Sequence, residues 1–258
     1  MQPELDLGPV ELQTFGICLA LAFIACGALL ARRFVELGRP TDWAYEALFA
    51  AVLGGLVGAR LDYLIQNWER VSDDLLGALF SGSGLVFFGG LAGGALGVAL
   101  WARWRGFLGL ELADAAAPTL ALGYAIGRVG CQISGDGDYG VASDLPWAMA
   151  YPEGAVPTTE VVHPTPIYET LALGLATLFL WRVRDRLRPG MVMAVYLLIA
   201  GAERVLIEFI RRNDAALVGL TIAQLVGVGM IAVALAWIVL GGGIRRERHL
   251  DGRPGSAA

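Results

Sequence analysis

The 258-residue sequence contains no lysine, so arginine supplies all 19 of its basic side chains. Charged residues make up only 17% of the chain, against about 25% in soluble domains. No basic face remains outside short arginine-containing loops, so we expect no nucleic-acid partner. The three cysteines, Cys18, Cys26 and Cys131, form no close Cys-x-x-Cys pair, which argues against a disulfide framework or a zinc site.

Other signals are also missing. The first nine residues are acidic and contain no basic residue, so a cleaved signal peptide is not expected. Asp136 and Asp138 are the only close acidic pair in the polar stretch around them, too few for a metal cage, and we expect neither a metal nor a cofactor. The run 135–140 spells Gly-x-Gly-x-x-Gly, but it follows an apolar helical segment rather than a strand, which argues against a dinucleotide-binding loop.

Apolar residues dominate what is present. They make up 56% of the chain, and the mean hydropathy is +0.61. Windows of about 20 apolar residues, the length that crosses a bilayer, recur along the sequence. They predict an all-α polytopic membrane protein with seven transmembrane helices, centred near Ala22, Leu53, Leu91, Leu120, Leu175, Leu198 and Val228.

The arginines predict the orientation of these spans. Most follow the first, third, fifth and seventh spans: Arg32, Arg33, Arg39, Arg103, Arg105, Arg182, Arg184, Arg186, Arg188, Arg245, Arg246, Arg248 and Arg253. The alternate loops contain only Arg70, Arg211 and Arg212. Because arginine accumulates in cytoplasmic loops, the N-terminus should lie outside and the C-terminus in the cytoplasm.

We expect a single transmembrane domain over residues 1–242. A small extracytoplasmic cap, at about 134–162 between the fourth and fifth helices, is rich in Gly, Pro, Asp and Thr and should form turns and short strands. Residues 243–258 should be a disordered cytoplasmic tail.

Glycines recur at every fourth position in 54–58 and 89–97, a spacing that lets membrane helices approach closely. We interpret Gly93 and Gly97 as packing residues. For Gly89 and Gly90 two interpretations stay open, since a bare backbone there would serve either helix packing or a bound lipid headgroup.

Several charged residues fall inside the predicted spans: Arg60, Asp62, Arg128, Glu169, Glu203, Arg204, Glu208 and Arg211. A charge at the bilayer centre costs at least about 2.5 kcal/mol, so such residues face a protein interior or a polar cavity. The spacing of Arg204, Glu208 and Arg211 places them on one face of the sixth span. Together these charges predict either a receptor for an anion such as lipid phosphate or a closed arginine–glutamate network that ties helices together.

The run Gly127-Arg-Val-Gly-Cys-Gln-Ile-Ser-Gly-Asp136 resembles the signature of the prolipoprotein diacylglyceryl transferases, roughly Gly-Arg-x-Gly-Asn-x-x-Asn-Gly-Glu. Gln224 in the last span also agrees with that family. So do three further stretches, in order and spacing: Gly58-Ala-Arg-Leu-Asp-Tyr-Leu-Ile-Gln-Asn67, His163-Pro-Thr-Pro-Ile-Tyr-Glu169 and Gly201-Ala-Glu-Arg-Val-Leu-Ile-Glu-Phe-Ile-Arg-Arg-Asn-Asp214.

The resemblance implies an enzyme of the bacterial cytoplasmic (inner) membrane that transfers the diacylglyceryl group of phosphatidylglycerol to the lipobox cysteine of prolipoprotein signal peptides. The reaction would form a thioether and release glycerol phosphate without a metal. Matching motifs assign lipid binding to Arg128 and catalysis to Arg204, with Glu208 orienting Arg204. The other residues expected to contact the lipid are Arg60, Asp136, Tyr168, Glu169, Gly89 and Gly90.

The sequence departs from the family pattern where a Phe-His-Gly-Gly motif supplies a histidine. Here the match is Phe87-Phe-Gly-Gly90, so Phe88 stands in that place. A thiol with an ordinary pKa near 8.5 needs a proton acceptor or a positive field to react. His163 is the only histidine expected on the outer side, and we assign it as the base. A helix-start role for His163 stays open, as do Glu169, Asp136 and the arginines as alternatives.

Two other functions are compatible with the sequence. A lipid-binding or lipid-moving paralogue would keep the pocket and lack the chemistry, because Phe88 replaces the histidine. A metal-dependent phosphatidyl transferase would require cation-dependent activity and more aspartates near the site than the pair Asp136 and Asp138.

Overall fold

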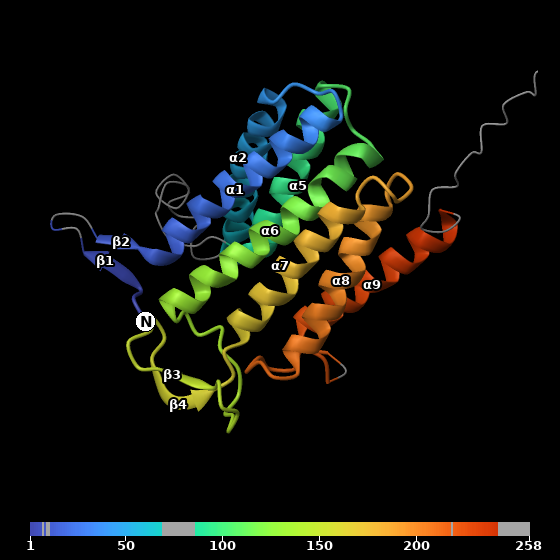
Figure 1. The fold of residues 1–258 in the computed structure, drawn as a ribbon. Helices are drawn as coiled ribbons and strands as arrows, with labels where there is room; N and C mark the ends of the chain where they lie inside the picture. The colour runs from blue at the N-terminus through green and yellow to red at the C-terminus, as the bar shows by residue number, and fades with distance from the viewer. Residues whose placement is uncertain (7, 9–10, 69–85, 218, 242–258) are drawn as a thin grey trace, which may run out of the picture.

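The computed structural model of the chain describes residues 1–6, 8, 11–68, 86–217 and 219–241. In these ranges the chain forms seven α-helices and two small β-hairpins (Figure 1). The helices are α1 (Thr14–Glu36), α2 (Asp42–Gln66), α5 (Phe87–Trp104), α6 (Leu110–Ser134), α7 (Thr165–Val183), α8 (Met191–Glu208) and α9 (Ile222–Leu240). Each predicted span centre falls in a different one of these helices, which confirms the mostly helical fold. Arg70 and the predicted tail lie outside the described residues.

Three of the described helices, α1, α2 and α9, are long and apolar enough to cross a bilayer. Large apolar side chains also point outward around the bundle, among them Ile24, Phe49, Leu96, Leu178 and Leu240. An apolar surface of this extent suits lipid rather than water. The protein is therefore a membrane protein.

Glycines bring α2 and α5 into backbone contact. A methyl group on Gly58 would overlap the carbonyl oxygen of Gly89 and lie 2.7 Å from the Cα atom of Gly93. A methyl group on Gly93 would likewise overlap the carbonyl oxygen of Gly54. The repeated glycines thus remove the side chains that would hold the two helices apart, and the packing interpretation of Gly93 is confirmed.

The cap begins where α6 ends. Gly135 has a left-handed φ of 61°, which favours glycine and stops the helix after Ser134. The chain then forms β3 (Met149–Tyr151) and β4 (Thr158–Val162), which pair antiparallel. The ring of Tyr139 stacks on that of Tyr151 in β3, with centroids 4.9 Å apart. Turns and short strands were predicted for this segment, and the structure confirms them.

A second hairpin precedes α1 and was not predicted. Its strands, β1 (Glu4–Asp6) and β2 (Glu11–Gln13), pair in the register Leu5 to Leu12. The amide of Gln2 donates to the carbonyl of Ile133 at the end of α6, over 3.0 Å. Both hairpins therefore lie at the same end of the helical bundle (Figure 1).

Candidate functional site

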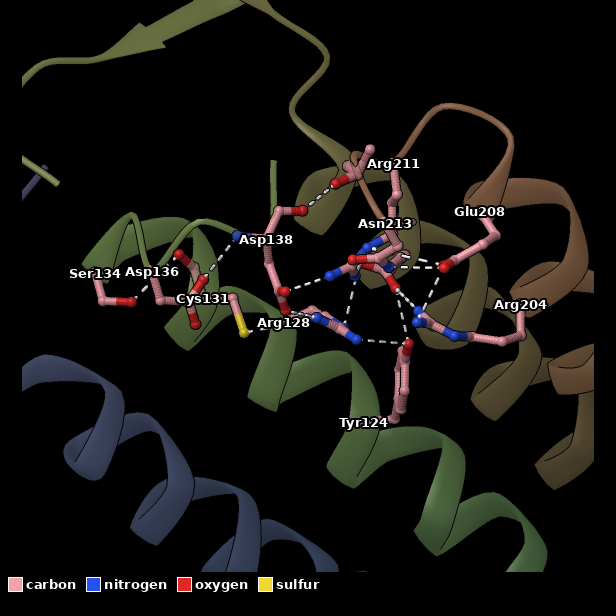
Figure 2. A network of polar contacts seen from close by, with 12 residues as sticks. Tyr124, Arg128, Cys131, Ser134, Asp136, Asp138, Arg204, Glu208, Arg211 and Asn213 are labelled. Carbon is pink, nitrogen blue, oxygen red and sulfur yellow. Dashed lines mark hydrogen bonds and ion pairs between the residues drawn. The ribbon is translucent and has the colours of Figure 1, made fainter. Parts of the chain in front are cut away.

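Helix α6, which corresponds to the fourth predicted span, presents a tyrosine and an arginine on one face. Tyr124 and Arg128 are four residues apart, and Arg128 Nη2 donates to the Tyr124 hydroxyl over 3.0 Å (Figure 2). The same hydroxyl donates to Glu169 Oε1 over 2.8 Å, and Arg128 Nε lies 3.2 Å from Glu169 Oε2. The guanidinium of Arg128 is thus held in place by α6 and α7 together.

Glu169 is the centre of this arrangement. It projects from the first turns of α7, and its side chain is 0% exposed. Besides Arg128, two more guanidinium groups approach it, with Arg204 Nη1 at 3.4 Å and Arg211 Nη1 at 3.7 Å. Three guanidinium groups, from α6, from α8 and from the segment after α8, therefore meet at one buried carboxylate.

Arg204 is also held from its own helix. Its Nη2 atom lies 3.1 Å from Glu208 Oε2, one turn further along α8. Glu208 is buried, and its other oxygen accepts from Asn213 Nδ2 over 2.7 Å. The predicted contact between Arg204 and Glu208 is present, with the geometry of a residue that positions the arginine (Figure 2).

The prediction that Arg211 continues the face of α8 is wrong. The helix ends at Glu208, and the amides of Ile210 and Arg211 donate back only three residues, as in a tight last turn. The Ile210 carbonyl accepts from Val141 of the cap, and Arg211 forms a β-bridge with Gly140. These backbone groups find partners in the cap, so the helix does not need to extend to satisfy them. Arg211 still reaches the cluster, with Nε 4.0 Å from Glu208 Oε2.

Asp138 closes the cluster from the cap side. Its carboxylate accepts hydrogen bonds from Arg128 and Arg211, and its backbone amide donates to Asp136 Oδ1 over 3.3 Å (Figure 2). Burial acts to raise the pKa of Asp138, but the charges of Arg128 and Arg211 hold that pKa below its ordinary value. Asp138 therefore stays ionised and links the cap to α6 and to the end of α8.

A cavity of about 400 Å³ opens in front of the arginines. Its lining comes from five helices and the segments that follow α6 and α8: Phe88, Leu91, Tyr124, Arg128, Asp138, Leu173, Tyr196, Ala200, Glu203, Arg204, Arg211, Ala223, Val226 and Met230. The charged residues sit among mostly apolar walls. The volume falls in the usual range of small-molecule sites. Within the described part of the chain, Arg211 Nη1 is buried without a hydrogen-bond partner, and it lies 3.7 Å from Glu169 Oε2.

Several residues predicted for the site lie elsewhere. His163 and Tyr168 lie where the cap meets α7, with His163 Nδ1 3.3 Å from the Tyr168 hydroxyl. That hydroxyl accepts from Trp147 Nε1 over 2.7 Å. Arg60 is buried in α2, with its guanidinium 5.3 Å from the centre of the Tyr63 ring. None of these residues lines the cavity.

Gly89 and Gly90 face α2. A methyl group on Gly89 would overlap Asp62, and one on Gly90 would lie 3.4 Å from the Cβ atom of Ala59. Packing therefore accounts for Gly89, while the neighbouring side chain of Phe88 lines the cavity.

One group of side chains has the composition of a metal site. Ligand atoms of Cys131, Asp136 and Asp138 lie within 4.8 Å of one another. Asp138, however, already accepts from two arginines, and Arg128 Nη1 lies 3.8 Å from Cys131 Sγ. In this structure Cys131 and Asp138 are thus neighbours of the Arg128 guanidinium.

Tyr124 and Asp138 are site residues that were not assigned from the sequence, and Arg211 was predicted only as one of the charged residues inside the spans. The spacing of four residues between Tyr124 and Arg128 was a usable signal for the tyrosine. Asp138 and Arg211 are 73 residues apart and meet only because the cap folds back on the end of α8.

Known proteins are similar to this chain over nearly its whole length. A family model described as prolipoprotein diacylglyceryl transferase matches residues 4–240. A protein of Dehalococcoides mccartyi is 34% identical, over 91% of this chain and 91% of that protein. One of Chromohalobacter salexigens is 35% identical over 97% of each chain, and one of Clostridium tetani is 30% identical over 82% and 86%. All three are named phosphatidylglycerol–prolipoprotein diacylglyceryl transferase. The chain belongs to the prolipoprotein diacylglyceryl transferase family, a family of transferases.

Proposed function

We propose that this protein transfers the diacylglyceryl group of phosphatidylglycerol to the lipobox cysteine in the signal peptide of a prolipoprotein. The observation that carries the proposal is the convergence of Arg128, Arg204 and Arg211 on one cavity with apolar walls. Guanidinium groups suit a phosphate, and the apolar walls suit the glyceryl and acyl parts of a lipid. The names of the relatives support the same substrates.

In the proposed reaction the cysteine sulfur attacks the glyceryl carbon next to the phosphate. A carbon–sulfur bond forms, and the bond between that carbon and the phosphate oxygen breaks. Glycerol phosphate leaves with the electron pair of the broken bond. Arg128 and Arg204 stabilise the charge that gathers on the leaving oxygen. Glu169 and Glu208 keep the two guanidinium groups in position, so little reorganisation is needed during the step.

The remaining predicted contacts are part of this proposal. Asp136 lies next to Asp138 in the cap, and Tyr168 and His163 lie on the outer side, where an acceptor peptide would arrive. Arg60, Gly89 and Gly90 belong to the α2–α5 pair, whose Phe88 and Leu91 line the cavity.

We further propose that all seven helices cross the bacterial cytoplasmic membrane as a single domain, residues 1–242, with the N-terminus outside and the C-terminus in the cytoplasm. The arginine distribution supports this orientation. It places the cap and the site at the outer face, so the lipid would come from the outer leaflet.

One observation favours a second candidate, a protein that binds lipid without transferring it. Phe88 lines the cavity in the position where the family resemblance expects a histidine, and its ring cannot accept a proton. This candidate shares the lipid site and differs only in the chemistry.

A transfer assay separates the two functions. Purified protein is incubated with labelled phosphatidylglycerol and a lipobox peptide, with and without a chelator, and lipidated peptide is measured. We expect product that is insensitive to the chelator and is reduced at least about 100-fold by Arg128→Ala or Arg204→Ala. Lipid binding without product from the wild type would support the second candidate, and product lost on chelation would point to a metal-dependent enzyme.

A further inference from the structure

Glu203 is a carboxylate that the architecture of the site leaves unused. It lies on α8 directly before Arg204, and its side chain lines the cavity. Its Oε1 atom is buried and has no hydrogen-bond partner among the described residues. A buried polar atom without a partner is costly, and native proteins rarely retain one without a use.

The other carboxylates of the site are engaged by cations. Glu169 contacts three arginines, Glu208 contacts Arg204, and Asp138 contacts Arg128 and Arg211. A carboxylate that already holds guanidinium groups is a poor proton acceptor, because the positive charges favour its ionised form. Glu203 differs from all three because no ion pair joins it to a described residue.

We propose that Glu203 is the catalytic residue that takes the proton from the acceptor thiol. The inference rests on the proposed function and names its base. Because the buried Oε1 atom of Glu203 accepts no hydrogen bond from the described residues, its ionised form is less stabilised than that of a fully solvated carboxylate, which makes it a better proton acceptor. The position beside Arg204 also puts the proton acceptor and the phosphate-binding groups in the same cavity.

The proton balance of the step is simple. Glu203 accepts the thiol proton as the sulfur attacks the glyceryl carbon, and the carbon–oxygen bond to phosphate breaks. The leaving glycerol phosphate carries the negative charge toward the arginines. The proton then passes from Glu203 to that product or to water, which returns the carboxylate to its starting form.

The position of the other candidate base supports this assignment. His163 contacts Tyr168 of α7, where the cap meets that helix, and does not line the cavity. Phe88 does line it, so a histidine placed there would face the same space as Glu203.

The test compares Glu203→Gln, which keeps the shape and removes the proton acceptor, with Glu160→Gln, a matched change at an exposed position of β4. Each variant is assayed with a cysteine peptide and with a selenocysteine peptide, whose selenol is already ionised at neutral pH. We expect Glu203→Gln to lower the rate with cysteine at least about 100-fold and to leave the rate with selenocysteine within about threefold of the wild type. Phe88→His in the Glu203→Gln background should restore part of the cysteine rate, and Glu160→Gln should match the wild type.

The outcomes distinguish this inference from the proposed function. A wild type that forms no thioether contradicts the proposed function itself. If the wild type and Glu203→Gln are equally active, only the role of Glu203 is overturned. The same holds if Glu203→Gln loses the same factor in rate with the cysteine and selenocysteine peptides while its melting temperature and lipid binding are unchanged. If Glu203→Gln does not fold, Glu203→Asp is used instead. The transfer rate of Glu203→Asp should fall about tenfold with the cysteine peptide and stay unchanged with the selenocysteine peptide. If its rate relative to the wild type is the same with both peptides, the assignment is contradicted.

Discussion

The site depends on properties that belong to the guanidinium group rather than to positive charge in general. A guanidinium carries five N–H donors in a plane, so Arg128 can bond Glu169 and Tyr124 and still present donors to a ligand. Its carbon also lies 4.9 Å from the centre of the Tyr124 ring, a cation–π contact that fixes the plane. A lysine would offer a point charge with no such orientation.

Two adjacent arginines allow a direct test of this view. Arg211 lines the cavity, whereas Arg212 pairs with Glu160 at the surface. We expect Arg211→Ala to lower the rate of diacylglyceryl transfer about 10- to 100-fold, the value of one charge-assisted hydrogen bond, and Arg212→Ala to change it less than about threefold. Initial rates with labelled phosphatidylglycerol provide the comparison. Similar losses in both variants would mean that Arg211 acts only by linking α8 to the cap.

Asp138 should make the stability of the folded protein depend on pH in the acidic range. Its pKa in the folded protein lies below the ordinary value of about 3.9, so its contribution is complete above about pH 5 and is lost as the pH falls through 4 and lower. At pH 7 we expect Asp138→Asn to cost about 2 kcal/mol, or about 4–8 °C in melting temperature.

Melting temperatures in detergent from pH 7 to pH 3 would measure this effect. The difference between wild type and Asp138→Asn should narrow as the pH falls below 4. Asp144→Asn, a change at an exposed position of the cap, should behave like the wild type at every pH. A difference that stays constant down to pH 3 would contradict the ion-pair account.

Among the helices, α2 and α5 show most clearly how small residues set an arrangement. Their backbones touch through Gly54, Gly58, Gly89 and Gly93, so the position of Phe88 and Leu91 at the cavity follows from this contact. Helices in lipid gain little from burying apolar side chains against one another, and close backbone packing supplies the stabilisation instead.

Gly93→Ala should therefore destabilise the protein. The added methyl group would overlap the carbonyl oxygen of Gly54 and force the helices apart, and we expect the melting temperature to fall by roughly 5 °C or more. Gly174→Ala in α7 is the matched control, since no atom lies within 4 Å of its added methyl group. It should leave the melting temperature unchanged or raise it slightly, because alanine favours helix over glycine by about 1 kcal/mol. Equal effects of the two changes would argue against tight packing of α2 on α5.

For the complete protein in its membrane, the orientation is the property that most constrains function. The three native cysteines are buried, so a cysteine introduced at an exposed position can be labelled selectively. We expect Asp144→Cys in the cap to react with a membrane-impermeant thiol reagent added outside the cell. Arg103→Cys, at the end of α5, should react only after the membrane is opened. The reverse pattern would place the site on the cytoplasmic side.

The positions of the helices could be predicted from the sequence because a bilayer allows few alternatives. A chain in lipid must pair its backbone groups internally, so each long apolar run becomes a helix, and a charge within a run must turn inward. Arg128, Arg204, Glu169 and Glu208 could be recognised on these grounds and from their motifs. The glycine spacing likewise predicted close helix contacts.

The arrangement of the site required the folded chain, because its contacts join residues far apart in sequence. The β1–β2 hairpin and the end of α8 depend on backbone partners near Ile133 and Val141, which no local pattern reveals. The same applies to Asp138, which meets Arg211 through the cap, and to His163, which lies outside the cavity. Burial and pairing are properties of the packed structure, so only the tertiary structure decides that Glu203 Oε1 is buried without a hydrogen-bond partner among the described residues.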